Sequence, residues 1–367
     1  MRSAIPIKAL YTFSLILLFS GACEQKVSDS DDAVYFTEED LPEPIQLVGE
    51  QYNIPEIINP RGIMIKDGLA IVFERKNEYD DKFHVIDLKS GSYLVSKGIH
   101  GLGPGEITVI SQIEDAGEKN KVWAYDPEVR KFSKYDLLET NKLAEEEFRS
   151  PQTEFFITYA TWAKDQTLLA NLVDGWTKYL HLTTSGDTLA TFGNWKDMIK
   201  GKELPNGYNE EDLDANLVST IFQGTLKGDP TKKYFVHAGK VADFIEIIDL
   251  ENRSSKLIYG PSHEFPEFKI SYSMEYQMAD FGRNSTSRYM DVYPGSSSFF
   301  ALFNGKTYQE LSDPDNLNRI FEFDYDGNIL NQYQLDFPVY GISVDEENRA
   351  IYAVTVDREP NMVRFDY

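Results

Sequence analysis

The sequence predicts an all-β protein: a six-bladed β-propeller closed by an N-terminal strand that pairs with the C-terminal blade. Three observations lead to this prediction. Strand–turn–strand units recur along the chain, most of them carry an aspartate at the same position, and no stretch has a convincing helical pattern. The last unit also lacks an outer strand, while the first predicted strand has no nearby partner. Pairing these two ends would remove two exposed sheet edges.

The clearest unit is residues 320–335, IFEFDYDGNILNQYQL. Its first half has the β-branched and aromatic residues typical of a strand, and Asp326-Gly327 is the strongest short signal for a tight hairpin turn. Related hairpins begin at Phe83, Phe132, Tyr179, Ile245 and Val363. Five of the six hairpins carry an aspartate in register, namely Asp87, Asp136, Asp249, Asp324 and Asp366.

Each of these hairpins follows another predicted strand pair, so a complete unit has four strands. The six units span residues 62–98, 110–148, 159–193, 218–259, 290–335 and 340–367. Residues 45–49 form the strand left over at the N-terminal end. A pair of β-sandwiches is the competing fold, but it requires a linker between two halves. The nearest candidate, residues 193–217, contains Trp195, Met198 and Ile199 and is predicted to be an ordered insertion.

The composition limits the possible functions of the 367-residue chain. Apolar residues make up 41% of it and aromatic residues 13%, which is ample for a packed core and excludes wholesale disorder. The net charge of −24 opposes phosphate backbones, so we expect no nucleic-acid partner. We expect a monomer.

The N-terminus has the pattern of an export signal. Arg2 and Lys8 precede an apolar segment, residues 9–19, which is too short to span a bilayer. Ser20-Gly21-Ala22 then precede Cys23, the only cysteine, and this junction resembles the lipobox of bacterial lipoproteins. We therefore predict a signal peptide over residues 1–22, lipid attachment at Cys23, a flexible acidic tether over residues 23–43 and a propeller over residues 44–367.

The acidic run EQKVSDSDD follows Cys23 directly. Such a run resembles the signal that sends some Gram-negative lipoproteins to the cell surface. The predicted location is therefore the outer membrane, with a lipid anchor and exposure at the cell surface. The periplasmic face of that membrane is the alternative.

The longest connections are predicted to lie on one face of the propeller, because they all link an outer strand to the next inner strand. They are residues 100–106, 194–217 and 261–289. The first has the sequence HGLGPGE, in which three glycines and Pro104 define a tight path. His100 and Glu106 are therefore candidate ligand-binding residues, and a purely structural corner between two blades is the alternative.

The segment containing Gly101, Gly103, Pro104, Gly105 and Glu106 resembles the G-x-G-P-G-E motif that is common in TolB-like six-bladed propeller lipoproteins of Gram-negative bacteria. Ile107 departs from the aromatic residue that usually follows the glutamate. The resemblance implies the propeller fold and lipoprotein status. It implies no established activity.

The sequence favours a binding protein over an enzyme. The five histidines are scattered, and neither a metal-binding histidine pair nor a nucleophile elbow occurs. The sequence therefore identifies no catalytic or metal-binding residue, and we expect no cofactor other than a possible Ca²⁺ ion. The alternative is a hydrolase of glycans or lactones with a calcium ion, held in the axial channel by carboxylates and Asn from different blades.

Aromatic and arginine residues in the longer connections are the other candidate ligand-binding residues, because sugar and peptide sites combine these side chains. They are Trp176, Trp195, Tyr272, Tyr276, Arg283 and Arg288. The alternative is that these aromatic residues pack the connections onto the blades. The predicted function is to bind an extracellular glycan, peptide or protein partner without catalysis. A structural subunit of an envelope complex is a further alternative.

Overall fold

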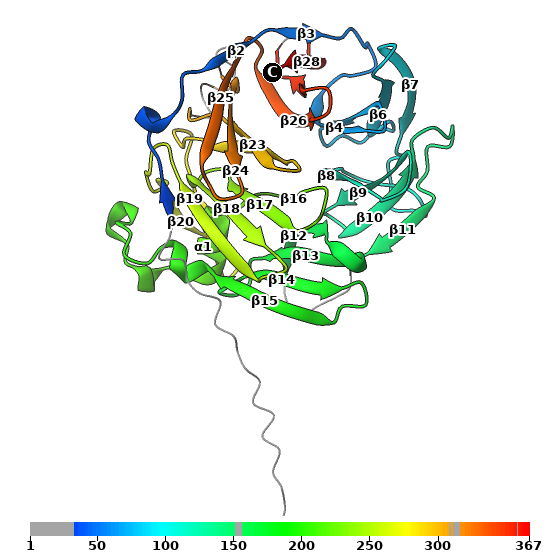
Figure 1. The fold of residues 1–367 in the computed structure, drawn as a ribbon. Coiled ribbons are helices and arrows are strands. Elements are labelled where there is room, and N and C mark those ends of the chain that lie inside the picture. The colour runs from blue at the N-terminus through cyan, green and yellow to red at the C-terminus, as the bar shows by residue number, and fades with distance from the viewer. Residues whose placement is uncertain (1–32, 151–155, 308–309, 311–315, 358) are drawn as a thin grey trace, which may run out of the picture.

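A computed structural model describes residues 33–150, 156–307, 310, 316–357 and 359–367. These residues form six β-sheets arranged as blades around a central axis (Figure 1), with the inner strands β4, β8, β12, β16, β22 and β26. Consecutive strands within each blade pair in antiparallel fashion. The predicted six-bladed propeller is confirmed.

The first blade consists of β4 (Pro60–Lys66), β5 (Leu69–Glu74), β6 (Phe83–Asp87) and β7 (Ser92–Lys97). The second consists of β8 (Gln112–Asp115), β9 (Lys121–Asp126), β10 (Lys131–Asp136) and β11 (Glu146–Arg149). The third consists of β12 (Ile157–Trp162), β13 (Thr167–Leu172), β14 (Thr177–Thr183) and β15 (Thr188–Asn194), with η2 (Lys164–Gln166) between β12 and β13. The fourth blade consists of β16 (Gly224–Gly228), β17 (Tyr234–Gly239), β18 (Phe244–Asp249) and β19 (Ser254–Tyr259). The fifth consists of β22 (Tyr289–Pro294), β23 (Ser298–Phe303), β24 (Arg319–Asp324) and β25 (Ile329–Leu335). The sixth contains β26 (Val339–Asp345), β27 (Ala350–Thr355) and β28 (Met362–Asp366).

The second strand of a blade is buried on both of its faces, because each blade packs between two neighbours. Every residue of β5, β13, β23 and β27 is buried. Their sequences accordingly read as continuous, mostly apolar runs, such as SFFALF in β23, rather than as the alternation of a half-exposed strand.

Four of the five repeated aspartates accept hydrogen bonds within the segments that follow the third strands. The Oδ1 atom of Asp87 accepts a hydrogen bond from the Ser90 backbone N–H at 2.7 Å, and Asp249 does the same for Asn252 at 2.9 Å. In the clearest unit, Asp324 accepts from the backbone N–H groups of Asp326 and Asn328. The aspartate repeat is thus a turn signal, since Asp side chains commonly bond the backbone of the residues that follow them.

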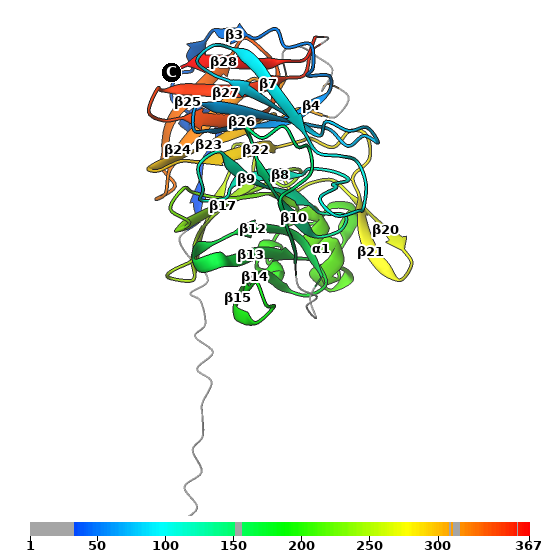
Figure 2. The same cartoon turned by 90° about the vertical axis from the view of Figure 1, so that its right-hand side faces the viewer.

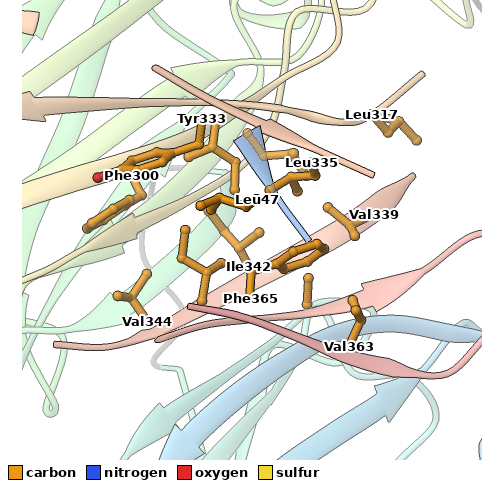
Figure 3. Close-up of a cluster of buried hydrophobic side chains, with 14 of the residues drawn as sticks. Leu47, Phe300, Leu317, Tyr333, Leu335, Val339, Ile342, Val344, Val363 and Phe365 are labelled. Carbon is orange, nitrogen blue, oxygen red and sulfur yellow. The ribbon is translucent and has the colours of Figure 1, made fainter. Parts of the chain in front are cut away.

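Ring closure by an N-terminal strand is confirmed, but the strand differs from the predicted one. β3 (Gly49–Gln51) pairs with β28 and supplies the missing outer strand of the sixth blade. β2 (Ile45–Leu47) runs parallel to β25 and extends the fifth blade instead. Leu47 from β2 lies beside Leu335 and Phe365 in the core between these two blades (Figure 3).

Residues before 44 also pack on the propeller. β1 (Val34–Tyr35) runs parallel to the outer strand β19 of the fourth blade, and η1 (Glu38–Asp40) follows it. Phe36 is only 3% exposed and packs on Phe321 and Phe323 of the fifth blade. Residues 34–43, which the sequence assigns to the tether, therefore lie along the rim of the propeller (Figure 1).

Two connections contain structure of their own. Residues 195–223 form η3 (Trp195–Met198), η4 (Pro205–Gly207), η5 (Glu210–Asp212) and α1 (Ala215–Ile221), and residues 260–288 contain the hairpin of β20 (Lys269–Ser273) and β21 (Tyr276–Asp280). The sequence starts the fourth unit at Val218, but Val218 lies in α1, and β16 begins at Gly224. No helix in the described part of the chain is long and apolar enough to cross a bilayer.

Candidate binding face and axial pocket

All the long connections emerge at one end of the ring, which we call the loop face. In an antiparallel four-stranded blade, the connection between the second and third strands and the link to the next blade leave from the same end. The links at residues 98–111, 195–223 and 260–288 are therefore on the loop face. Seen from the side, α1, β20 and β21 lie together on one side of the ring (Figure 2).

The glycine-rich segment forms a tight corner between the first two blades. The Oε2 atom of Glu106 accepts a hydrogen bond from the Gly103 backbone N–H at 2.7 Å, so its carboxylate folds back into its own loop. A side chain at Gly101 would lie 2.0 Å from this oxygen, which explains the glycine. The neighbouring Ile107 is fully buried in the core between the two blades. This geometry favours the structural alternative for Glu106.

His100 lies at the start of the same corner. Its backbone N–H donates to Asp80 at 2.8 Å, and its Nδ1 atom lies 3.0 Å from Lys82 Nζ. Burial lowers the pKa of Lys82. His100 therefore connects the corner to the loop between β5 and β6.

The two long links share a core of their own. Trp195 is completely buried, and its indole N–H donates to the Leu172 carbonyl at 3.0 Å. Packed with it are residues from both links, including Met198, Leu213, Leu217, Ile221, Phe222 and Phe268. Trp195 thus has no surface available to a ligand, and the packing alternative holds for this residue.

The remaining predicted residues lie on the link at residues 260–288 and on the β13–β14 connection. Arg288 is 5% exposed and contacts Glu264, with 3.2 Å between Nη2 and Oε2. Trp176 is partly exposed and lies beneath the Lys196 ammonium group, which is 4.7 Å from its ring centroid. Arg283 is exposed. The structure does not bring these three residues together with His100 and Glu106 in one pocket.

Tyr272 and Tyr276 lie on the β20–β21 hairpin and are 68% and 50% exposed. Met274, at the turn, is 95% exposed, and Met278 is 37% exposed. The hairpin is held close to its turn, because the Gln277 side chain accepts from the Asp214 N–H and donates to the Asp212 carbonyl, both at 3.0 Å. The two links therefore present an exposed apolar hairpin on a packed support.

A buried polar network lies beneath the links, between the third and fourth blades. Lys178 forms an ion pair with Glu246, and the Tyr179 hydroxyl donates to Glu246 Oε2 at 2.7 Å. The same hydroxyl lies 2.8 Å from His237 Nδ1. Burial alone would raise the pKa of Glu246, but Lys178 and hydrogen bonds from Ser255 and Tyr179 hold it below its usual value.

Burial is the main cause that lowers the pKa of His237 to about 3; the charges of Lys178 and Lys240 act in the same direction, and Glu246 opposes them. Because the folded state keeps this ring neutral, the unfolded state binds one more proton below pH 6.5. We expect this group to remove about 1.4 kcal/mol of stability between pH 7.5 and pH 5.5. Urea unfolding at both pH values should therefore show a smaller difference for His237→Gln than for the wild type, and equal differences would contradict the prediction.

An axial pocket of about 50 Å³ opens toward the loop face, inside the ring of inner strands. Arg61, from the start of β4, and Lys240, from the β17–β18 connection, line it together with Lys227 and Asp291. Lys227 Nζ lies 2.7 Å from Asp291 Oδ1. Among the described residues, no carboxylate forms an ion pair with Arg61 or Lys240. Burial lowers the pKa of Lys240, as does the charge of Arg61, while Asp291 opposes them.

A larger cavity of about 360 Å³ lies at the opposite end of the axis. Ile63, Gln112 and Lys227 line both spaces, so these side chains divide the axis into two. Two carboxylates that line this larger cavity are paired with lysines: Lys232 Nζ lies 3.3 Å from Glu114, and Lys66 Nζ lies 2.6 Å from Asp115.

Sequence reasoning did not identify the axial residues. Arg61 and Lys227 lie on inner strands and Lys240 lies in a short connection, so no spacing along the chain relates them. Position on the first strand of a blade is the only signal that marks Arg61, Lys227 and Asp291. Within the described residues, no group of three or more His, Cys, Asp or Glu side chains could hold a metal ion.

Comparison with known proteins agrees with this architecture. The model of a family described as TolB-like 6-blade propeller-like matches residues 38–347. The chain belongs to this family. The resemblance suggested by Gly101–Glu106 is therefore confirmed. No curated protein matches the sequence.

Solved structures of low sequence identity align with most of the chain. A DUF4221 family member from Bacteroides vulgatus has a TM-score of 0.52 at 10% identity, covering 88% of this chain and 96% of its own. A Bacteroides fragilis protein that is thought to be exported has a TM-score of 0.49 at 13% identity, covering 91% and 98%. Virginiamycin B lyase from Staphylococcus aureus has a TM-score of 0.44 at 12% identity, covering 88% and 99%.

Proposed function

We propose that this TolB-like propeller is a recognition protein that binds an extracellular partner on its loop face and has no catalytic role. The exposed β20–β21 hairpin is the observation that carries this proposal. It presents Tyr272, Met274, Tyr276 and Met278 to solvent on one short element. Tyr and Met are enriched at protein interfaces, and exposed apolar patches mark interaction sites.

The hairpin chemistry favours a peptide or protein over a glycan. β20 and β21 form a two-stranded sheet, and no third described strand pairs with either edge. An unpaired edge can accept an extended peptide by adding a strand, with the side chains of the hairpin supplying apolar contacts. The support from Gln277 limits the entropy lost when a partner binds.

The proposed location is the outer membrane, with a lipid anchor at Cys23 and the propeller at the cell surface. Cys23 lies outside the described residues, so the proposal rests on the lipobox-like junction and the acidic run. The described chain enters along the outer edge of the fourth blade, through β1, rather than across the axial pocket.

The proposal can be tested with peptide and glycan arrays on a protein of residues 33–367. We expect ligands of one class to bind the wild type and to bind Tyr272→Ser/Tyr276→Ser at least about tenfold more weakly, because two aromatic contacts are lost. Tyr79→Ser is the matched control, since Tyr79 is 79% exposed in another loop-face connection. Equal binding by the hairpin variant and the wild type would contradict the proposal.

A calcium-dependent hydrolase is the second candidate, and the axial pocket does not favour it. The pocket contains three cationic side chains and one carboxylate, whereas calcium sites consist of oxygen ligands with several carboxylates. The third candidate, a structural subunit of an envelope complex, would use the same exposed hairpin. It would appear as one constant partner at the hairpin rather than as a class of array ligands.

A further inference from the structure

We propose a second binding site that is independent of the hairpin: the axial pocket binds one compact oxyanion group, a carboxylate, phosphate or sulfate, between Arg61 and Lys240. Both side chains line the same pocket, at its loop-face end. The protein as a whole carries a charge of −24, so an unmatched positive site at its axis is a local reversal of sign. Concave sites of one sign concentrate ions of the opposite sign.

The charge of the pocket follows from its contacts. Asp291 is its one carboxylate, and Oδ1 of Asp291 is paired with Lys227 at 2.7 Å. Oδ2 of Asp291 accepts a hydrogen bond from the Ile342 backbone N–H at 3.0 Å. Asp291 therefore compensates Lys227, and the charges of Arg61 and Lys240 remain unmatched within the described residues.

Neighbouring side chains strengthen this positive character. The Arg75 guanidinium lies 4.5 Å from the ring centroid of Tyr340, which itself lines the pocket. Tyr340 thus lies between the pocket and a further cation that has no ion pair among the described residues. Burying cations without partners is costly, so an anion that pairs with them would be stabilised on entry.

The donors and the size of the pocket define the ligand class. A guanidinium offers a planar set of N–H donors that matches an oxyanion in bidentate fashion, and an ammonium adds a compact charge. A volume of about 50 Å³ holds a few waters or one such group, but no larger molecule. The ligand is therefore a small anion, or the anionic end of a molecule that extends onto the loop face.

Titration with sodium phosphate, sodium sulfate and sodium acetate tests the site, using residues 33–367 and sodium chloride to keep the ionic strength constant. We expect saturable binding of one anion per chain by calorimetry, and a melting temperature that rises with its concentration. Arg61→Gln and Lys240→Gln should each weaken binding at least about tenfold. Arg283→Gln, an exposed loop-face change of the same charge, should not alter it.

Both pocket variants should fold, because each removes a cation that repels its neighbour, and their melting temperatures without anion provide the check. Binding of acetate alone would assign a carboxylate ligand, and binding of phosphate or sulfate alone would assign a tetrahedral anion. The proposal would be overturned if none of the three anions bound saturably. It would also be overturned if the double variant Arg61→Gln/Lys240→Gln bound an anion as tightly as the wild type. The hairpin variant Tyr272→Ser/Tyr276→Ser should retain anion binding, so the two proposals fail separately.

Discussion

Replacing Glu246 with glutamine should lower the free energy of unfolding by about 3–5 kcal/mol, because it leaves the buried Lys178 ammonium without a counter-charge. Glu246 is 1% exposed and Lys178 is 3% exposed, so water cannot take over the lost interaction. Glutamine keeps the shape of the side chain, and the loss therefore reports on charge rather than on a cavity. Urea unfolding measures it.

A double variant distinguishes the cost of one unpaired buried charge from the contribution of the ion pair itself. Lys178→Met/Glu246→Leu removes both charges and should recover most of the lost stability, since an apolar pair of similar volume often replaces a buried ion pair without cost. Glu251→Gln is the control, because it breaks the exposed pair with Lys164 and should change stability by less than about 1 kcal/mol. If Glu246→Gln and Glu251→Gln had equal effects, the network would not stabilise the contact between the third and fourth blades.

Removing the N-terminal rim strands is expected to have the second large effect. A chain that begins at residue 52 lacks β3, so β28 becomes an open edge at the junction of the ring. It also lacks Leu47, which is 5% exposed in the core between the fifth and sixth blades, and Phe36, which is 3% exposed in the core between the fourth and fifth blades. Loss of each of these side chains costs about 2–5 kcal/mol in comparable cores. We expect this chain to unfold at a much lower temperature and to aggregate.

A chain that begins at residue 44 provides the comparison. It keeps β2 and β3 but loses β1, η1 and Phe36, and we expect an intermediate melting temperature between those of the chains that begin at residues 33 and 52. Equal melting temperatures for the chains beginning at residues 33 and 44 would show that residues 34–43 add no stability. Size-exclusion chromatography would detect aggregation of the shortest chain.

The sequence predicted the architecture because a propeller repeats its signals. The Asp-Gly turn in residues 320–335 and the aspartates at the ends of the third strands mark local structure, and local structure is what a pattern along the chain reports. The closing strand was placed a few residues too early, because Ile45–Leu47 has the stronger apolar character. The polar strand Gly49–Gln51 is specified instead by its position opposite Val363–Phe365, which no local pattern reveals.

The binding site was less predictable, because a pattern along the chain reports local structure and not which distant residues meet in the fold. Aromatic residues in long links are ambiguous, and the structure divides them: Trp195 packs inside the links, while Tyr272 and Tyr276 are exposed. The axial cations escaped prediction because Arg61 and Lys240 meet only when the ring forms. Each of them, taken alone, has the appearance of an ordinary surface charge.

The pairing of β3 with β28 also determines when the ring can close during folding. Gly49–Gln51 is synthesised well before its partner Val363–Phe365, and the Gln51 side chain donates to a carbonyl 308 residues away. Contacts between such distant segments form slowly, since the intervening chain must first be ordered. The first five blades can pack on one another before β3 has paired with β28. The ring can unfold as one cooperative unit only after β28 has paired with β3.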